Sequence, residues 1–246
     1  MSQCIDGPVF ALGLFMPRNR NFVHQPGVFH VGSRTNNKEW FEMPLPQVWE
    51  LSTDLLWFSS RAFGVELQAF VLMSNHYHLL LRTSEANLPA FMCYFSREMS
   101  RAINREMGRI NHIFGARYFA SLVDDWKYHH AVYKYIYRNP VDAGLGKKVE
   151  LYPYSTLQGL LGFSRLPVGV VDPLELVERP EETLDWLNFS FHEDQRECIR
   201  KGLKGARFEW KTGRRKRNCW TNDLVFPTNA EGYQKVGGTF GQIFSF

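Results

Sequence analysis

Two apolar segments separated by only two residues constrain the fold of this chain more than any other feature. The segment 65-VELQAFVLM-73 alternates well enough for a β-strand, and 76-HYHLLLR-82 follows it almost at once. Ser74 and Asn75 between them are typical of a tight turn. The sequence therefore predicts a β-hairpin, and with it an antiparallel sheet, near the middle of the chain.

The segments on either side of this hairpin supply helices and two further strands. Apolar residues recur at helical spacing from Pro44 to Phe63, and Gly64 closes that segment. The other elements are predicted as a strand at 28–34, an amphipathic helix at 86–107, a strand within 112–123, and a helix from Asp125 to Pro140. This order matches a ferredoxin-like split βαβ arrangement. The predicted fold class is α+β, a ferredoxin-like antiparallel sheet with helices on one face, plus a mainly helical C-terminal extension.

Length and composition bound the class of protein. The chain has 246 residues, of which 44% are apolar, enough to bury a sizeable core. No apolar run approaches the roughly 18 residues of a membrane helix, so no membrane partner is expected. The four cysteines are scattered without the spacing of a zinc or redox motif, which is typical of a reducing compartment. We therefore expect a cytoplasmic protein.

Composition shifts divide the chain into three parts. We expect residues 1–15 to be a leader, which is either disordered or not translated if Met16 is the true start. Residues 16–163 form the main domain. A linker-like stretch, 166-LPVGVVDPLELVERPEE-182, opens a C-terminal extension at 164–246, which contains a helical pattern and then a basic segment.

The histidines of the hairpin are the first candidate functional residues. On a strand, His76 and His78 point to the same face and Tyr77 to the opposite face. Two imidazoles about 7 Å apart on one face are able to converge on one cation. A histidine pair on a solvent-facing strand edge is the alternative interpretation, and the His-x-His spacing alone does not decide between the two.

The stretch 133-YKYIYRNPVDAGL-145 contains the second candidate pair. Tyr135 and Asn139 are four residues apart and thus share one face of the predicted helix. They offer a phenol that can act as a nucleophile and an amide oxygen that can bind a metal. Pro140 disfavours helical geometry at Asn139, so Asn139 is expected just past the last turn. His129 and His130, earlier on the same helix, are expected at the surface.

In this order, the two motifs resemble those of the single-tyrosine HUH transposases. They are most similar to the REP-associated tyrosine transposases, a bacterial group related to the transposases of single-strand insertion sequences. The resemblance spans residues 16–162 and includes the segment 151-LYPYSTLQGLLG-162. Ser74 stands where the family more often has proline, and no catalytic consequence is expected.

The resemblance implies a fold, a mechanism and a substrate. It implies the HUH endonuclease fold, with His76 and His78 as metal ligands, Asn139 as the third ligand and Tyr135 as the nucleophile. The cofactor would be Mg²⁺ or Mn²⁺, and the substrate a single-stranded DNA hairpin of REP type, cut through a 5′-phosphotyrosine intermediate. It also implies a nucleoid-associated monomer rather than a dimer. The alternative is a catalytically retired protein that binds hairpins without cutting them.

Two basic regions are candidates for DNA binding in a chain of net charge +4. Arg97, Arg101 and Arg105 form a stripe on the predicted helix 86–107, although a solvated helix face explains them equally well. The segment 200–217 holds nine basic residues and one acidic residue, and ends in Arg214, Arg215, Lys216 and Arg217. Phe208 and Trp210 within it are expected to stack on bases. Arg34, Arg117 and Arg138 lie near the motifs and are not assigned a role.

Overall fold

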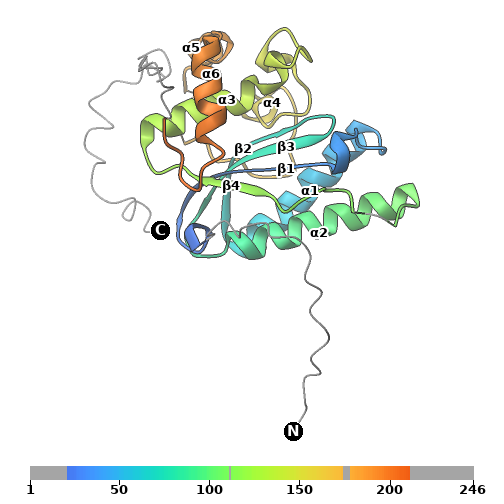
Figure 1. Cartoon of the computed structure of the whole chain (residues 1–246). Helices are drawn as coiled ribbons and strands as arrows, with labels where there is room; N and C mark the ends of the chain where they lie inside the picture. Colours follow the sequence, from blue (N-terminus) through green and yellow to red (C-terminus); the bar gives the residue numbers. More distant parts are fainter. Residues whose placement is uncertain (1–20, 111, 174–177, 211–246) are drawn as a thin grey trace.

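The computed structural model describes residues 21–110, 112–173 and 178–210, and its elements follow the predicted order (Figure 1). The strands are β1 (Gly27–Arg34), β2 (Val65–Leu72), β3 (His76–Thr83) and β4 (Phe119–Leu122). The α-helices are α1 (Leu45–Phe63), α2 (Leu88–Met107), α3 (Trp126–Asp142), α4 (Leu157–Leu160), α5 (Pro180–Asn188) and α6 (Glu193–Gly202). Short 3-10 turns occur at η1 (Asn21–Val23), η2 (Asn36–Lys38) and η3 (Val149–Leu151).

The strands form an antiparallel sheet in the order β2-β3-β1-β4, which is the ferredoxin-like arrangement. The hairpin is built as predicted, with Leu72 opposite Tyr77 and a 2.7 Å hydrogen bond from Met73 N to His76 O across the turn. Gly64 ends α1 and Gly108 ends α2, both in the left-handed conformation that glycine adopts without strain. The predicted fold class is confirmed.

Helices cover both faces of this sheet (Figure 1). Helices α1 and α2 pack on one face, where Leu79 and Leu81 of β3 are buried together with Phe95 of α2. On the opposite face, Leu80 of β3 is buried with Ile136 of α3 and with residues of the C-terminal extension. The structure therefore extends the predicted arrangement, in which helices covered one face, because α3 lies across the second face.

Helix α3 continues two residues beyond the predicted end at Pro140. Asp125 begins it as expected, since its carboxylate accepts a 2.8 Å hydrogen bond from Lys127 N. Pro140 is tolerated because it lies in the final turn, and Ala143 N still donates to Asn139 O at 3.0 Å. Asn139 therefore lies within the helix, and the expectation that it lies just past the last turn is corrected.

The C-terminal extension is anchored to α3 through buried cations. Arg138 is buried and donates hydrogen bonds to the carbonyl oxygens of Leu187 at 3.1 Å and Asn188 at 2.6 Å. The ammonium group of Lys134 lies 5.1 to 5.3 Å from the ring centroids of Trp186, Phe189 and Phe191. Arg138 therefore joins α3 to the extension and does not face solvent.

Segments from the C-terminal half also cover both edges of the sheet. Beside β4, Leu122 N donates to Ala206 O at 2.9 Å and Phe208 N donates to Leu122 O at 2.7 Å. Beside β2, Leu72 N donates to Tyr154 O at 3.0 Å. Phe208 is fully buried in the core cluster, so the expectation that it stacks on DNA bases is wrong.

His130 is buried rather than exposed, contrary to the sequence-based expectation. Its ring packs against Trp126 and Trp186, with centroid distances of 5.6 and 6.2 Å. Burial, followed by the neighbouring His129, lowers the pKa of His130 to about 3. The extension again explains the error, because Trp186 of α5 covers this side of α3.

This burial predicts a pH-dependent loss of stability. Between a pKa of about 6.5 in the unfolded chain and about 3 in the folded chain, only the unfolded state takes up the His130 proton, so acid favours unfolding. Lowering the pH from about 7.5 to about 5.5 should cost about 1.4 kcal/mol from this residue. In urea unfolding, His130→Gln should show a correspondingly smaller pH effect, whereas the exposed His112→Gln should behave like wild type. Identical pH effects in all three proteins would contradict the prediction.

Candidate active site

Four aromatic side chains meet on the α3 face of the sheet. The His76 and His78 rings of β3 have centroids 5.2 Å apart, and the His78 ring lies 5.9 Å from the ring of Tyr135 on α3. His30 of β1 stacks on His78 at 5.1 Å and lies 6.4 Å from Tyr135. The fold thus brings the histidine motif and the tyrosine motif, which are far apart in sequence, into one cluster.

His30 supports His78 from the neighbouring strand. Its Nε2 lies 3.0 Å from Nδ1 of His78, a hydrogen bond between two buried rings. The register explains this contact, because Gly32 is opposite His78 and His30 is two residues away on the same face. This contact depends on the β1–β3 register and therefore cannot be read from the sequence of either strand alone.

His76 is held by the turn of the hairpin. Its Nδ1 lies 2.7 Å from Oδ1 of Asn75, and Asn75 Nδ2 donates to Lys38 O at 2.7 Å. Burial, and then the charge of Arg34, lowers the pKa of His76 to about 4. Burial, together with His30, His76 and Arg34, also lowers the pKa of His78 well below its usual value. Both rings are therefore neutral at pH 7.

These features fit a metal site in which the protein supplies the imidazoles of His76 and His78 as ligands. Both hydrogen bonds use Nδ1, so the remaining nitrogen of each ring is Nε2, and partners of this kind commonly orient ligating histidines. Neutral imidazole is also the form that binds metals. Within the described ranges, no group of three or more His, Cys, Asp or Glu side chains is arranged around a common ion. Additional ligands would therefore be an amide, water or the phosphate of a substrate.

The hydroxyl of Tyr135 lies in a largely buried environment with several polar neighbours. Burial raises the pKa of Tyr135, while a hydrogen bond from Asn139 and the charges of Arg200 and Arg34 oppose that rise. Asp142 adds to the rise. Asn139 also lies one turn from Tyr135, with its Nδ2 3.4 Å from the Tyr135 carbonyl oxygen. Its predicted role as a third metal ligand stays a prediction.

Phe119 closes the side of the cluster toward β4 and was not anticipated from the sequence. Its ring centroid lies 5.4 Å from that of His30 and 6.2 Å from that of His78, and the residue is 37% exposed. Gly32 allows this position, because a Cβ atom there would collide with the Phe119 ring. The Phe119 ring thus borders the cluster on this side and is partly exposed to solvent.

The predicted arginine stripe lies away from this cluster. Arg97, Arg101 and Arg105 are on α2, which packs on the opposite face of the sheet from α3. Glu98 accepts hydrogen bonds from Arg97 at 2.8 Å and Arg101 at 3.4 Å. A DNA-binding role for this stripe stays a prediction. The other predicted contacts, Arg214, Arg215, Lys216 and Arg217, lie outside the described residues.

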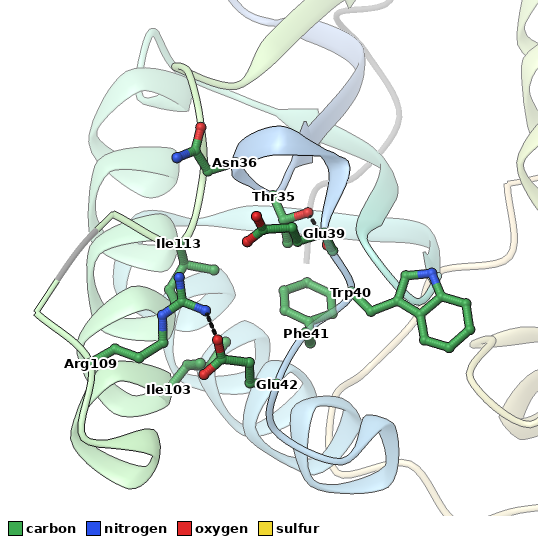
Figure 2. A pocket seen from close by; sticks show the side chains of 9 residues that line it. All are labelled: Thr35, Asn36, Glu39, Trp40, Phe41, Glu42, Ile103, Arg109 and Ile113. Carbon is green, nitrogen blue, oxygen red and sulfur yellow. Dashed lines mark hydrogen bonds and ion pairs between the residues drawn. The ribbon is translucent and has the colours of Figure 1, made fainter.

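The loop after β1 is docked against the hairpin turn. Thr35 N donates to Asn75 O and Phe41 N to Ser74 O, both at 2.9 Å. Figure 2 shows the side chains that line a small pocket beside this loop, where Arg109 pairs with Glu42 while Trp40 points away. None of the clustered histidines, nor Tyr135, lines this pocket. The loop therefore supports the hairpin turn, and the small pocket is separate from the aromatic cluster.

Comparison with known proteins finds one family model that matches part of the chain. Residues 47–139, which include both motifs, match the model of the family described as transposase, IS200 like. No curated protein matches the sequence. A solved structure of a REP-associated tyrosine transposase bound to a REP hairpin is similar, with 19% identity and a TM-score of 0.46, over 60% of this chain and 88% of that one. Among the described residues, no helix is long and apolar enough to cross a membrane.

Proposed function

We propose that this chain is a metal-dependent single-stranded DNA endonuclease and strand transferase, because residues 47–139 match the model of the IS200-like transposases. Its proposed substrate is a DNA hairpin of REP type, and Tyr135 is the proposed nucleophile. The observation that supports this function best is the position of the Tyr135 ring, 5.9 Å from the His78 ring and on the same face of the sheet as His76.

In the proposed reaction, the phenol oxygen of Tyr135 forms a bond to a phosphodiester phosphorus, and the bond from phosphorus to the 3′ oxygen breaks. The phenol gives up its proton to solvent and the departing 3′ oxygen takes one up. The product is a 5′-phosphotyrosine link and a free 3′ hydroxyl. Because the phosphodiester is exchanged rather than hydrolysed, a 3′ hydroxyl can reverse the step and joining needs no ATP.

His76 and His78 are the proposed protein ligands for Mg²⁺ or Mn²⁺, with Asn139 as the proposed third. A cation held there would supply Lewis-acid stabilisation of charge on the phosphate. The hydrogen bonds to Asn75 and His30 would hold the two imidazoles in position for binding.

We also propose that the site operates within a monomer. Tyr135 and both histidines of the cluster come from the same chain, and segments of that chain cover both edges of the sheet. Within the described residues, backbone hydrogen bonds at Leu122 of β4 and Leu72 of β2 occupy part of each edge through which two sheets could otherwise join. Light scattering should therefore give a mass near 28.7 kDa. A mass of about twice that value across the working concentration range would contradict this proposal.

The function is tested by trapping the covalent intermediate. Single-stranded hairpins taken from palindromic repeats beside the gene are incubated with the protein and Mn²⁺ or Mg²⁺, then separated on a denaturing gel. The expected result is a protein–DNA adduct that is absent when EDTA is added. Tight hairpin binding without any adduct would instead support the alternative function, a protein that binds DNA hairpins but does not cut them.

A further inference from the structure

Phe119 is the most exposed of the five aromatic residues that meet at the candidate active site. It is 37% exposed, whereas His30 and His78 are buried and His76 and Tyr135 are half-buried. The centroid of its ring lies 5.4 Å from that of His30 and 6.2 Å from that of His78. The Phe119 ring therefore lies between the buried histidines and solvent.

The pairing of three strands fixes the position of this ring. Phe119 of β4 is opposite Gly32 of β1, and Gly32 is in turn opposite His78 of β3. These residues form one row across the sheet, and residues paired in this way project from the same face. Because a Cβ atom at position 32 would collide with the Phe119 ring, glycine there lets the ring lie close to β1. The sheet itself, rather than a loop, thus holds Phe119 beside the histidines.

The surroundings of the exposed side of Phe119 suit a nucleotide better than an apolar partner. The ring is flanked by imidazoles, so it is a single apolar group beside polar ones rather than part of an apolar patch. Arg34 is exposed and lies opposite His76 in the β1–β3 register, which adds a positive charge to the same face of the sheet. A phosphate bound at the histidines would carry a base one sugar away, within reach of the Phe119 ring. Aromatic side chains beside a backbone-binding site commonly stack on such bases.

We propose that the Phe119 ring stacks on an unpaired base of single-stranded DNA, at a nucleotide that adjoins the phosphate attacked by Tyr135. This inference rests on the proposed function and deepens it by naming a contact to a base. Phe119 is then a positioning residue, because a stacked base limits where the attached phosphate can lie relative to the histidines and the phenol. Every base has a π face, so this contact tolerates different sequences and contributes affinity rather than sequence readout.

Binding is measured in a Tyr135→Phe background with EDTA, so that no cleavage occurs. The probe is a fluorescein-labelled hairpin oligonucleotide with unpaired nucleotides beside the hairpin foot, titrated at several salt concentrations. Phe119→Leu keeps an apolar side chain but removes the π face, and should weaken binding at least about fivefold, the lower end for one lost base stack. The salt slope should not change, since no charge is lost. Phe119→Trp should retain binding. The control is Phe58→Leu on α1, where Phe58 is 47% exposed on the other side of the sheet, and it should bind like the parent protein.

A series of probes that each lack one unpaired base distinguishes stacking from a structural role of Phe119. At one nucleotide, removal of the base should weaken binding to the parent protein but cost Phe119→Leu nothing further, because both changes delete the same contact. If base removal cost the two proteins equally at every position, Phe119 would contact no base and the inference would be overturned, even if wild type forms a covalent adduct. Absence of an adduct in wild type would overturn the proposed function alone, because the binding series requires no cleavage.

Discussion

Replacing Tyr135 by phenylalanine should abolish the covalent adduct while leaving hairpin binding nearly unchanged. The variant lacks the only atom proposed to bond phosphorus, so adduct formation should fall by at least about 10³-fold. The ring that packs near His30 and His78 remains, and phenylalanine therefore preserves those contacts. A denaturing gel measures the adduct, and fluorescence anisotropy with the same oligonucleotide measures binding.

Tyr133→Phe is the matched control for this experiment. Tyr133 lies two residues earlier on α3, but it is buried in the core against Tyr137, with ring centroids 4.8 Å apart. Loss of its hydroxyl should leave adduct formation intact. If Tyr135→Phe still formed a wild-type amount of adduct, another residue would be the nucleophile and the proposed mechanism would be wrong.

The order of elements could be read from the sequence because each carries a local signal. The hairpin turn at Ser74 and Asn75, and the left-handed glycines that end α1 and α2, act over only a few residues. The end of α3 was placed too early because Pro140 lies in the last turn, and Ala143 N after it still donates to Asn139 O. Helix ends are set by such details of capping rather than by the periodic pattern.

His76, His78 and Tyr135 were named from the sequence as candidate site residues. His30 and Phe119, which contact them in the structure, were not. The resemblance implied that Tyr135 and His78 share a site, and they lie close together because α3 crosses the second face of the sheet, which was not predicted. The contact between His30 and His78, and the position of Phe119 over Gly32, depend on pairing between strands that are distant in sequence. No periodicity within a single segment contains that information.

Two of the wrong expectations, those for His130 and Phe208, have the C-terminal extension as their physical cause. His130 was expected at the surface and Phe208 on DNA bases, and both are buried where α3 and the extension meet. Their own segments give no sign of this burial, because the partners come from α5, α6 and the residues that follow α6. The packing of the extension on α3 therefore removes side chains from solvent that the local sequence pattern places at the surface.

Replacing His76 by alanine should remove metal-dependent cleavage together with metal binding. His76 is one of only two proposed imidazole ligands, and within the described residues no cluster of three His, Cys, Asp or Glu side chains offers a substitute. Mn²⁺ affinity of the DNA complex, measured by electron paramagnetic resonance, should therefore fall by more than the roughly 10- to 100-fold typical of a lost outer-shell partner. Cleavage should not return at higher Mn²⁺ concentration.

Asn75→Ala provides the graded comparison for His76→Ala. It deletes the amide oxygen that lies 2.7 Å from His76 Nδ1 but keeps the imidazole itself. Metal affinity should then fall by about 10- to 100-fold, and a higher Mn²⁺ concentration should restore cleavage. This ordering distinguishes a ligand from a residue that orients it, because only loss of the ligand resists rescue by excess metal. Cleavage by His76→Ala at the wild-type rate and Mn²⁺ concentration would exclude His76 from the metal site and leave the histidine pair with a purely structural role.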